Sequence, residues 1–285
     1  MRVAIIGQGY VGLTIAVDSA GAGHTVVGFD VNAELVKKLN LGHSHIEGIT
    51  DSHLGSLIES GSYLASSNPS TLAGCEVIVI AVPTPLDDQR NPDLSFVHAA
   101  ADLITKNVKS PALVVNESTS YPGTLRSEIA ARISGVQHLY ASSPERVDPG
   151  NTQWGTKNTP RLIGGLTPQA VAKAKEFYAT FCDTIIEVSS PEVAEAANQR
   201  HYYDTILTNY GPYSYNMKNM LKHDLLYDAD MEYADRYIAE FHEEFEPDEN
   251  YKLQGLITIR DIEKLEQFCH DEHLSKSTKY SKIGF

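Results

Sequence analysis

The sequence predicts an α/β fold: a doubly wound, mostly parallel sheet with a smaller, largely helical C-terminal segment. Two observations support this class. Short apolar runs alternate with helix-like segments over residues 1–190. These runs are continuously apolar, as expected for strands that are buried on both faces by covering helices. The first run also leads directly into a glycine-rich turn, which fixes how the N-terminal unit begins.

That N-terminal unit has the pattern of a dinucleotide-binding Rossmann fold. An apolar strand ends in Gly7-x-Gly9-x-x-Gly12, a helical run follows, and a second apolar strand ends at Asp30. Gly7 permits the tight turn, Gly9 allows the backbone to approach a pyrophosphate, and Gly12 allows the helix to pack on the strand. The helix N-terminus, which includes Tyr10 and Val11, offers backbone N–H groups to the phosphates.

Asp30 selects the type of dinucleotide. It lies about 20 residues beyond the glycine turn, where a carboxylate accepts hydrogen bonds from a ribose 2′-hydroxyl. A 2′-phosphate would be repelled there, and Val31 and Asn32 supply no compensating positive charge. The sequence therefore predicts NAD rather than NADP as the cofactor.

Composition excludes several other classes. The 285 residues are 42% hydrophobic and 21% charged, with a formal net charge of −14, which disfavours a general nucleic-acid or membrane-surface binder. The three cysteines have no disulfide-framework spacing. The short apolar N-terminal run is explained as a strand, so we expect neither a signal peptide nor a membrane span, and we expect a cytoplasmic protein. No metal site is expected, because the histidines and acids near Cys269 suit a solvated helix better.

The remaining elements follow from the same patterns. Apolar runs predict strands at 77–82, 113–116, 138–142, 161–165 and 184–188, and helical periodicity predicts helices at 94–106, 124–133 and 168–181. Residues 42–70 form an acidic, Gly/Ser-rich stretch with no assigned element. Beyond residue 197 the alternation fades and tyrosines, acids and histidines become dense. We therefore predict a dinucleotide-binding domain over 1–190 and a divergent helical segment or domain over 191–285.

Four further motifs mark the expected site, and the first three follow the carboxyl ends of strands, where doubly wound sheets bind ligands. In order they are Val82-Pro83-Thr84-Pro85, Glu117-Ser118-Thr119-Ser120-Tyr121-Pro122-Gly123-Thr124, Ser143-Pro144-Glu145-Arg146-Val147-Asp148-Pro149-Gly150-Asn151 and Arg161-Leu162-Ile163-Gly164-Gly165.

Together with the glycine turn, these motifs make residues 1–197 resemble the UDP-glucose/GDP-mannose dehydrogenase family, closest to its UDP-N-acetylhexosamine 6-dehydrogenases. The resemblance implies oxidation of the C6 alcohol of a nucleotide-linked sugar with two NAD molecules and a covalent step on a cysteine. It also implies a role in polysaccharide biosynthesis and a homodimer.

The resemblance also implies roles for individual residues. Thr119 would help to hold a water or oxyanion near the reacting carbon, and Glu145 would act with a water as acid and base. Arg146 and Asn151 would shape the substrate-side loop. Without the resemblance, Thr119 could simply cap a turn and Glu145 could pair with Arg146. The expected cofactor-binding residues are Gly7, Gly9, Tyr10, Val11, Gly12, Asp30, Val82, Pro83, Thr84, Ser118, Thr119 and Glu145.

The second half departs from the family pattern. Asn198 stands where the family has a catalytic lysine, Tyr202 stands where it has an asparagine, and the surroundings of Cys269 lack the family's glycine-rich loop. Tyr202 could serve as a replacement base, although packing in the core or at an interface explains the local aromatic cluster better. Three interpretations stay open. The chain could perform a single hydride transfer, or a transient oxidation with re-reduction as in an NAD-dependent epimerase or lyase; it could be a non-catalytic NAD-binding regulator or assembly protein; or its catalysis could be rebuilt from C-terminal residues.

Overall fold

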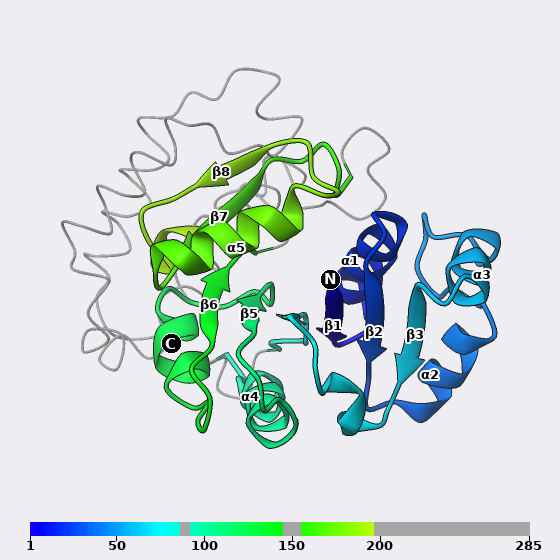
Figure 1. The fold of residues 1–285 in the computed structure, drawn as a ribbon, viewed down its shortest axis with the longest axis horizontal. Helices are drawn as coiled ribbons and strands as arrows, with labels where there is room; N and C mark the ends of the chain where they lie inside the picture. The colour runs from blue at the N-terminus through cyan, green and yellow to red at the C-terminus, as the bar shows by residue number, and fades with distance from the viewer. Residues whose placement is uncertain (86–91, 145–154, 197–285) are drawn as a thin grey trace, which may run out of the picture.

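The computed structural model describes residues 1–85, 92–144 and 155–196 (Figure 1). These residues form one sheet of eight strands in the order β3-β2-β1-β4-β5-β6-β7-β8. The strands are β1 (Arg2–Ile6), β2 (Thr25–Phe29), β3 (Tyr63–Ser66), β4 (Val77–Ile80), β5 (Leu113–Asn116), β6 (Leu139–Ser142), β7 (Arg161–Gly165) and β8 (Ile185–Glu187).

The strand order confirms the predicted doubly wound sheet. The chain starts in the middle of the sheet, moves outward through β2 and β3, and then crosses back to β4 and onward, which is the 3-2-1-4-5-6 order of the Rossmann fold. All strand pairs are parallel except β6 with β7. The change of direction between β1 and β4 creates the crevice in which such folds bind ligands.

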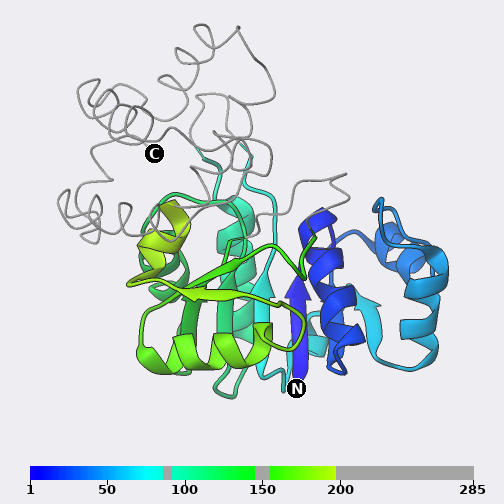
Figure 2. The ribbon, with the colours of Figure 1, turned by 90° about the horizontal axis from the view of Figure 1, so that it is seen from above.

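Helices cover both faces of the sheet (Figures 1 and 2). Residues Val3 and Ile5 of β1 pack with α1 and α5 on one face, whereas Ala4 and Ile6 pack with α4 and η2 on the other. Successive strand side chains point to opposite faces, so a strand buried on both sides is apolar throughout. The helices are α1 (Tyr10–Gly21), α2 (Ala33–Asn40), α3 (Asp51–Glu59), α4 (Ser95–Asn107), α5 (Pro168–Tyr178), the 3₁₀ turn η1 (Pro69–Leu72) and the π-helical turn η2 (Leu125–Ala130).

The Gly/Ser-rich stretch 42–70 contains more structure than its composition indicates. It forms α3 and the edge strand β3, which pairs in parallel with β2. Only two of the four β3 residues, Tyr63 and Ala65, are buried, so the strand lacks the continuous apolar run of its neighbours. The Asn40 side chain accepts a hydrogen bond from Ala65 N and donates one to Ala65 O, at 3.0 and 2.9 Å. This contact satisfies backbone groups of an edge strand that would otherwise be open to pairing.

Two predicted helices are shorter than expected. Residues 124–133 form only the six-residue turn η2, and α5 ends at Tyr178 rather than at residue 181. Residues 191–196 are helical and bury Val193, Ala194 and Ala196. The division into domains near residue 190 stays a prediction.

Candidate dinucleotide site

A cavity of about 550 Å³ opens at the carboxyl ends of β1, β2, β4 and β5. This is the crevice on either side of the β1–β4 switch point. Ten of the residues predicted from the sequence to bind the cofactor line it: Gly7, Gly9, Tyr10, Val11, Asp30, Val82, Pro83, Thr84, Ser118 and Thr119. The structure therefore brings together residues from four separate motifs.

Gly7 and Gly12 shape the turn from inside the protein. Gly7 has a φ of +93°, and its N–H donates to Phe29 O at 2.8 Å. A Cβ atom on Gly7 would lie 2.4 Å from Ala81 O, and one on Gly12 would lie 1.8 Å from Gly7 O. Neither position tolerates a side chain, because the obstructing atoms belong to the backbone.

Gly9 has the opposite environment. A Cβ atom there would meet nothing within 4 Å, and Gly9 lines the cavity. Gly9 is also the N-cap of α1 and provides no side-chain hydrogen bond to the helix end. A helix N-terminus whose cap carries no side chain leaves space for an anion to approach the backbone. Gly9 thus fits the pyrophosphate of a dinucleotide.

Gln8 is a structural residue that the sequence did not reveal. Its side chain is fully buried, donates to Ile5 O and Gly7 O, and accepts a hydrogen bond from the Tyr63 hydroxyl at 2.8 Å. A Cβ atom on Gly28 would lie 2.3 Å from Gln8 Oε1, so Gly28 provides the space for this amide. Gln8 therefore links the turn to β2 and β3.

Asp30 is oriented by two backbone donors. One carboxylate oxygen accepts from Gln8 N and the other from Asn32 N, both at 2.8 Å. Both bonds fix the side chain on the β2 side of the cavity, where it would hold the adenosine ribose. Nearby, Val31 and Phe96 line the cavity with 80% and 46% of their surfaces exposed. Exposed apolar side chains in a cavity favour a flat ring such as adenine.

The loops after β4 and β5 are bonded to each other. The Ser118 hydroxyl accepts a hydrogen bond from Val82 N at 3.0 Å, and the Thr84 hydroxyl donates to Thr119 O at 2.6 Å. Thr119 is exposed at the cavity wall. These contacts place both loops on the side of the cavity opposite Asp30.

A buried ion pair supports the start of the β5 loop; its residues belong to the predicted motifs, but the motifs do not predict the contact between them. Glu117 accepts hydrogen bonds from Arg161 Nη1 at 2.8 Å and from the Tyr178 hydroxyl. The Arg161 guanidinium lies 4.7 Å from the centre of the Tyr178 ring. Burial, followed by the negative charge of Glu117, raises the pKa of Tyr178 well above its usual value. The phenol therefore stays a hydrogen-bond donor at neutral pH.

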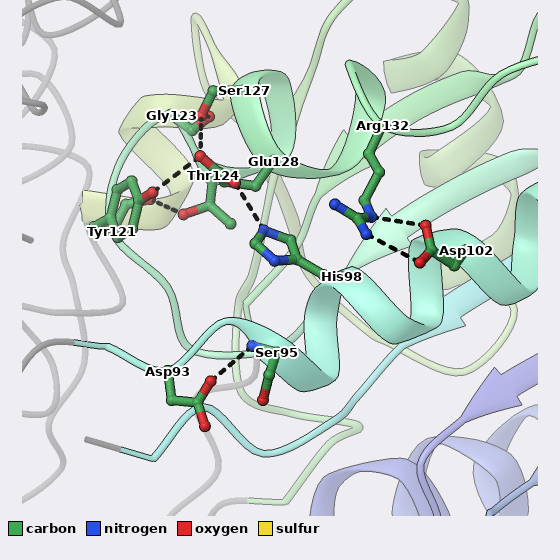
Figure 3. A network of polar contacts seen from close by, with 10 residues as sticks. All are labelled: Asp93, Ser95, His98, Asp102, Tyr121, Gly123, Thr124, Ser127, Glu128 and Arg132. Carbon is green, nitrogen blue, oxygen red and sulfur yellow. Dashed lines mark hydrogen bonds and ion pairs between the residues drawn. The ribbon is translucent and has the colours of Figure 1, made fainter. Parts of the chain in front are cut away.

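A second polar group fixes the helix that forms one wall of the cavity (Figure 3). One side of α4 lines the cavity with Phe96, Ala99, Ala100 and Leu103. Its other side is tied to η2 and the residues beyond it, through His98 to Glu128 at 2.7 Å and Asp102 to Arg132 at 2.7 Å. These pairs orient α4 relative to the cavity.

The predicted catalytic and substrate-side residues Glu145, Arg146, Asn151 and Tyr202 lie outside the described residues, as do Asn198 and Cys269. Cys75 and Cys182 are buried free thiols. The described parts of the chain contain no cluster of three or more His, Cys, Asp or Glu side chains suited to a metal. Within those same parts, no helix combines the length and the apolar character needed to cross a bilayer.

A sequence profile described as "UDP-glucose/GDP-mannose dehydrogenase family, NAD binding domain" matches residues 1–182. The chain belongs to this family. The match identifies NAD as the dinucleotide, in agreement with Asp30 and the glycine turn. The matched residues include all those that line the cavity described above.

Its relatives include two dehydrogenases of UDP-N-acetylhexosamines. The UDP-N-acetyl-D-mannosamine dehydrogenase of Pyrococcus horikoshii is 34% identical over 202 residues, which are 68% of this chain and 48% of that protein. The UDP-N-acetyl-D-glucosamine 6-dehydrogenase of Pseudomonas aeruginosa is 32% identical over 205 residues, or 69% of this chain and 48% of that protein. The chain spans about half the length of these curated relatives.

A solved structure has a similar fold. The UDP-D-ManNAc dehydrogenase from Pyrococcus horikoshii superposes with a TM-score of 0.67 at 26% identity, covering 96% of this chain and 69% of that chain. The similarity in fold agrees with the Rossmann topology derived from the strand order.

Proposed function

We propose that this chain is an NAD-dependent oxidoreductase that acts on a nucleotide-linked sugar. The main support for this proposal is the cavity at the switch point. It is lined by Gly9, which has open space beside it, by Asp30, which two backbone donors orient, and by the loop with Ser118 and Thr119. NAD, when bound, supplies a hydride acceptor. The chain's own residues would bind the diphosphate at the α1 N-terminus, select an unphosphorylated ribose and close the other side of the cavity.

The substrate class follows from the relatives. Both are named for UDP-N-acetylhexosamines, so we propose a sugar of this class, in a pathway that builds polysaccharides. Arg146 and Asn151 would contact the substrate. A homodimer is part of the same proposal.

For catalysis we propose Thr119, Glu145 and Tyr202. Thr119 is supported by its exposed place on the cavity wall beside the bonded β4 and β5 loops. Glu145 follows Ser143-Pro144 at the end of β6, the next strand of the sheet, and would exchange protons through a water. Tyr202 would act as a base in place of a residue that the family supplies from its central helix.

We further propose that this chain performs one hydride transfer and not the cysteine-dependent second oxidation. The support is in the sequence: Asn198 stands at the position of the family's lysine, and Cys269 lies among acids, which disfavour the thiolate that a nucleophile needs.

The test combines binding with product counting. Calorimetry should detect NAD binding and weaker NADP binding. Incubation with UDP-N-acetylhexosamines should then form one NADH per sugar, whereas two NADH per sugar would contradict the single-transfer proposal. No NADH with any UDP- or GDP-sugar would favour the regulator, and a tightly bound cofactor that does not exchange would favour transient oxidation.

One variant tests the proposed acid–base residue. Glu145→Gln should abolish NADH formation and leave the NAD dissociation constant nearly unchanged, because the amide cannot exchange protons but keeps the side-chain shape. Equal loss of both properties would show that Glu145 supports the cavity rather than the chemistry.

A further inference from the structure

Two acidic side chains from residues 191–196 are buried against the end of the β5 loop. Glu192 and Glu195 are each only 1% exposed. The Glu195 carboxylate accepts hydrogen bonds from Gly123 N at 2.7 Å and from Leu125 N at 2.9 Å. Glu192 accepts from Arg126 Nε at 2.8 Å. A segment 70 or more positions later in the chain thus binds the backbone where η2 begins.

Glu195 holds one end of a loop whose other end is held in a similar way. The loop runs from Glu117 to Leu125. Its start is bonded through the Glu117 side chain to Arg161 and Tyr178, and its end is bonded through its backbone to Glu195. Between these two anchors lie the cavity-lining residues Ser118 and Thr119.

The backbone at the Glu195 anchor has two N–H groups that need a partner from elsewhere in the chain. Gly123 has a φ of +102°, a conformation that glycine adopts but does not strongly prefer. Its N–H and that of Leu125 lie at a helix start, where backbone donors lack partners within the helix. A buried carboxyl group that accepts a hydrogen bond from each of them fixes the turn.

We propose that Glu195 is a positioning residue of the dinucleotide site: by binding Gly123 N and Leu125 N it sets the loop that presents Ser118 and Thr119 to the cofactor. This proposal rests on the proposed NAD-binding function. It assigns Glu195 an effect on the half of the cavity formed by β4 and β5, and none on the half formed by β1, β2 and Asp30.

The experiment compares two ligands in matched variants. ADP occupies only the half of the cavity around the glycine turn and Asp30, whereas NAD extends across both halves. Calorimetry should show that Glu195→Gln weakens NAD binding about tenfold and leaves ADP binding unchanged, since the amide nitrogen faces a backbone donor and loses one hydrogen bond. Glu187→Gln, the same change at an exposed glutamate paired with Lys175, should alter neither.

Amide hydrogen exchange provides a readout that needs no variant. In the unmodified protein the Gly123 and Leu125 amides should be protected, and NAD should slow their exchange further. Glu195→Gln should abolish that additional slowing. If Glu195→Gln does not fold, Glu195→Asp, whose shorter side chain draws back from the same donors, replaces it.

Several results would overturn the assignment. Unprotected Gly123 and Leu125 amides in the unmodified protein would do so, as would a Glu195 variant that matches Glu187→Gln with both ligands. Equal weakening of ADP and NAD would show general destabilisation instead of positioning. Absence of NAD binding by the unmodified protein would refute the proposed function itself, and the amide protection would still report on the Glu195 contact.

Discussion

At the scale of single residues, the three glycines of the N-terminal turn have separable tasks. Gly7 and Gly12 face backbone atoms, and Gly9 faces open space in the cavity. The same motif letter therefore marks two packing positions and one ligand position. Substitutions at Gly9 and Gly12 should consequently change different properties.

Gly9→Val should leave the free energy of unfolding nearly unchanged and weaken NAD binding at least about tenfold, because its side chain would project into the space for the diphosphate. Urea denaturation and calorimetry measure the two quantities. Gly12→Ala is the matched contrast. Its Cβ atom would collide with Gly7 O, so it should destabilise the protein as well as weaken binding. A Gly9→Val variant with native affinity would contradict the placement of the diphosphate.

Asp30 should set the preference for NAD over NADP. Asp30→Asn removes the negative charge that opposes a 2′-phosphate and keeps an oxygen that can accept one of the two backbone hydrogen bonds. We expect the ratio of NADP to NAD affinity to rise about tenfold, measured by calorimetry with both cofactors. Asp18→Asn, a change on α1 outside the cavity lining, should leave the ratio unaltered.

At the scale of elements, one buried ion pair joins the start of β7 to the end of β5. Arg161 is 4% exposed and bonds both Glu117 and the backbone oxygen of Ser143, at the end of β6. It therefore ties together three adjacent strand ends beside the cavity.

Arg161→Met should lower the free energy of unfolding by about 3–5 kcal/mol, because it leaves the Glu117 carboxylate buried without its cation. Arg132→Met removes an exposed partner of Asp102 and should change stability little. Urea denaturation of both variants checks the difference. Similar decreases in the free energy of unfolding of the two variants would mean that the buried pair stabilises the protein no more than the exposed pair does.

The sequence predicted those elements that have a continuous apolar run or a strong helical period. It missed β3, because an edge strand buried on one face carries only two core residues in a polar stretch. It anticipated the cavity residues well, because motif order places strand ends at one edge of a parallel sheet. It placed Glu117 and Arg161 in motifs but did not predict their pairing, and it did not anticipate Gln8 or Glu195. The burial of these side chains depends on partners that lie 44 to 72 positions away in the sequence.

At the scale of the whole molecule, the buried carboxyl of Glu195 makes stability depend on pH. Burial, only partly offset by the two backbone hydrogen bonds, raises the pKa of Glu195 from its ordinary 4.5 to about 8. Glu192, Arg126 and Tyr121 are the other titratable or charged groups around it; the negative charge of Glu192 raises its pKa and the positive charge of Arg126 lowers it.

The direction in which the free energy of unfolding changes with pH follows from proton binding. Between the two pKa values the folded state keeps a proton on Glu195 that the unfolded chain releases, so stability falls as pH rises toward the folded pKa. His24 and His138 have pKa values lowered chiefly by burial, and their contribution runs the other way at more acidic pH. The window from about pH 7 to about pH 8 therefore shows the Glu195 effect most clearly, because it lies above the titration of the histidines and below that of the Cys75 thiol, whose pKa is raised by burial and which adds a decrease of the same sign at higher pH.

Urea denaturation across that window should show the free energy of unfolding decreasing with pH in the unmodified protein. Glu195→Gln, which cannot ionise, should remove most of this slope, whereas Glu187→Gln at an exposed site should retain it. The decrease should be steepest below the folded pKa and should level off above it, because there Glu195 has lost its proton in the folded state as well as in the unfolded chain. If the free energy of unfolding of Glu195→Gln fell with pH as steeply as that of the unmodified protein, another group would be responsible. Glu195 would then be ionised in the folded state, stabilised by its two backbone hydrogen bonds.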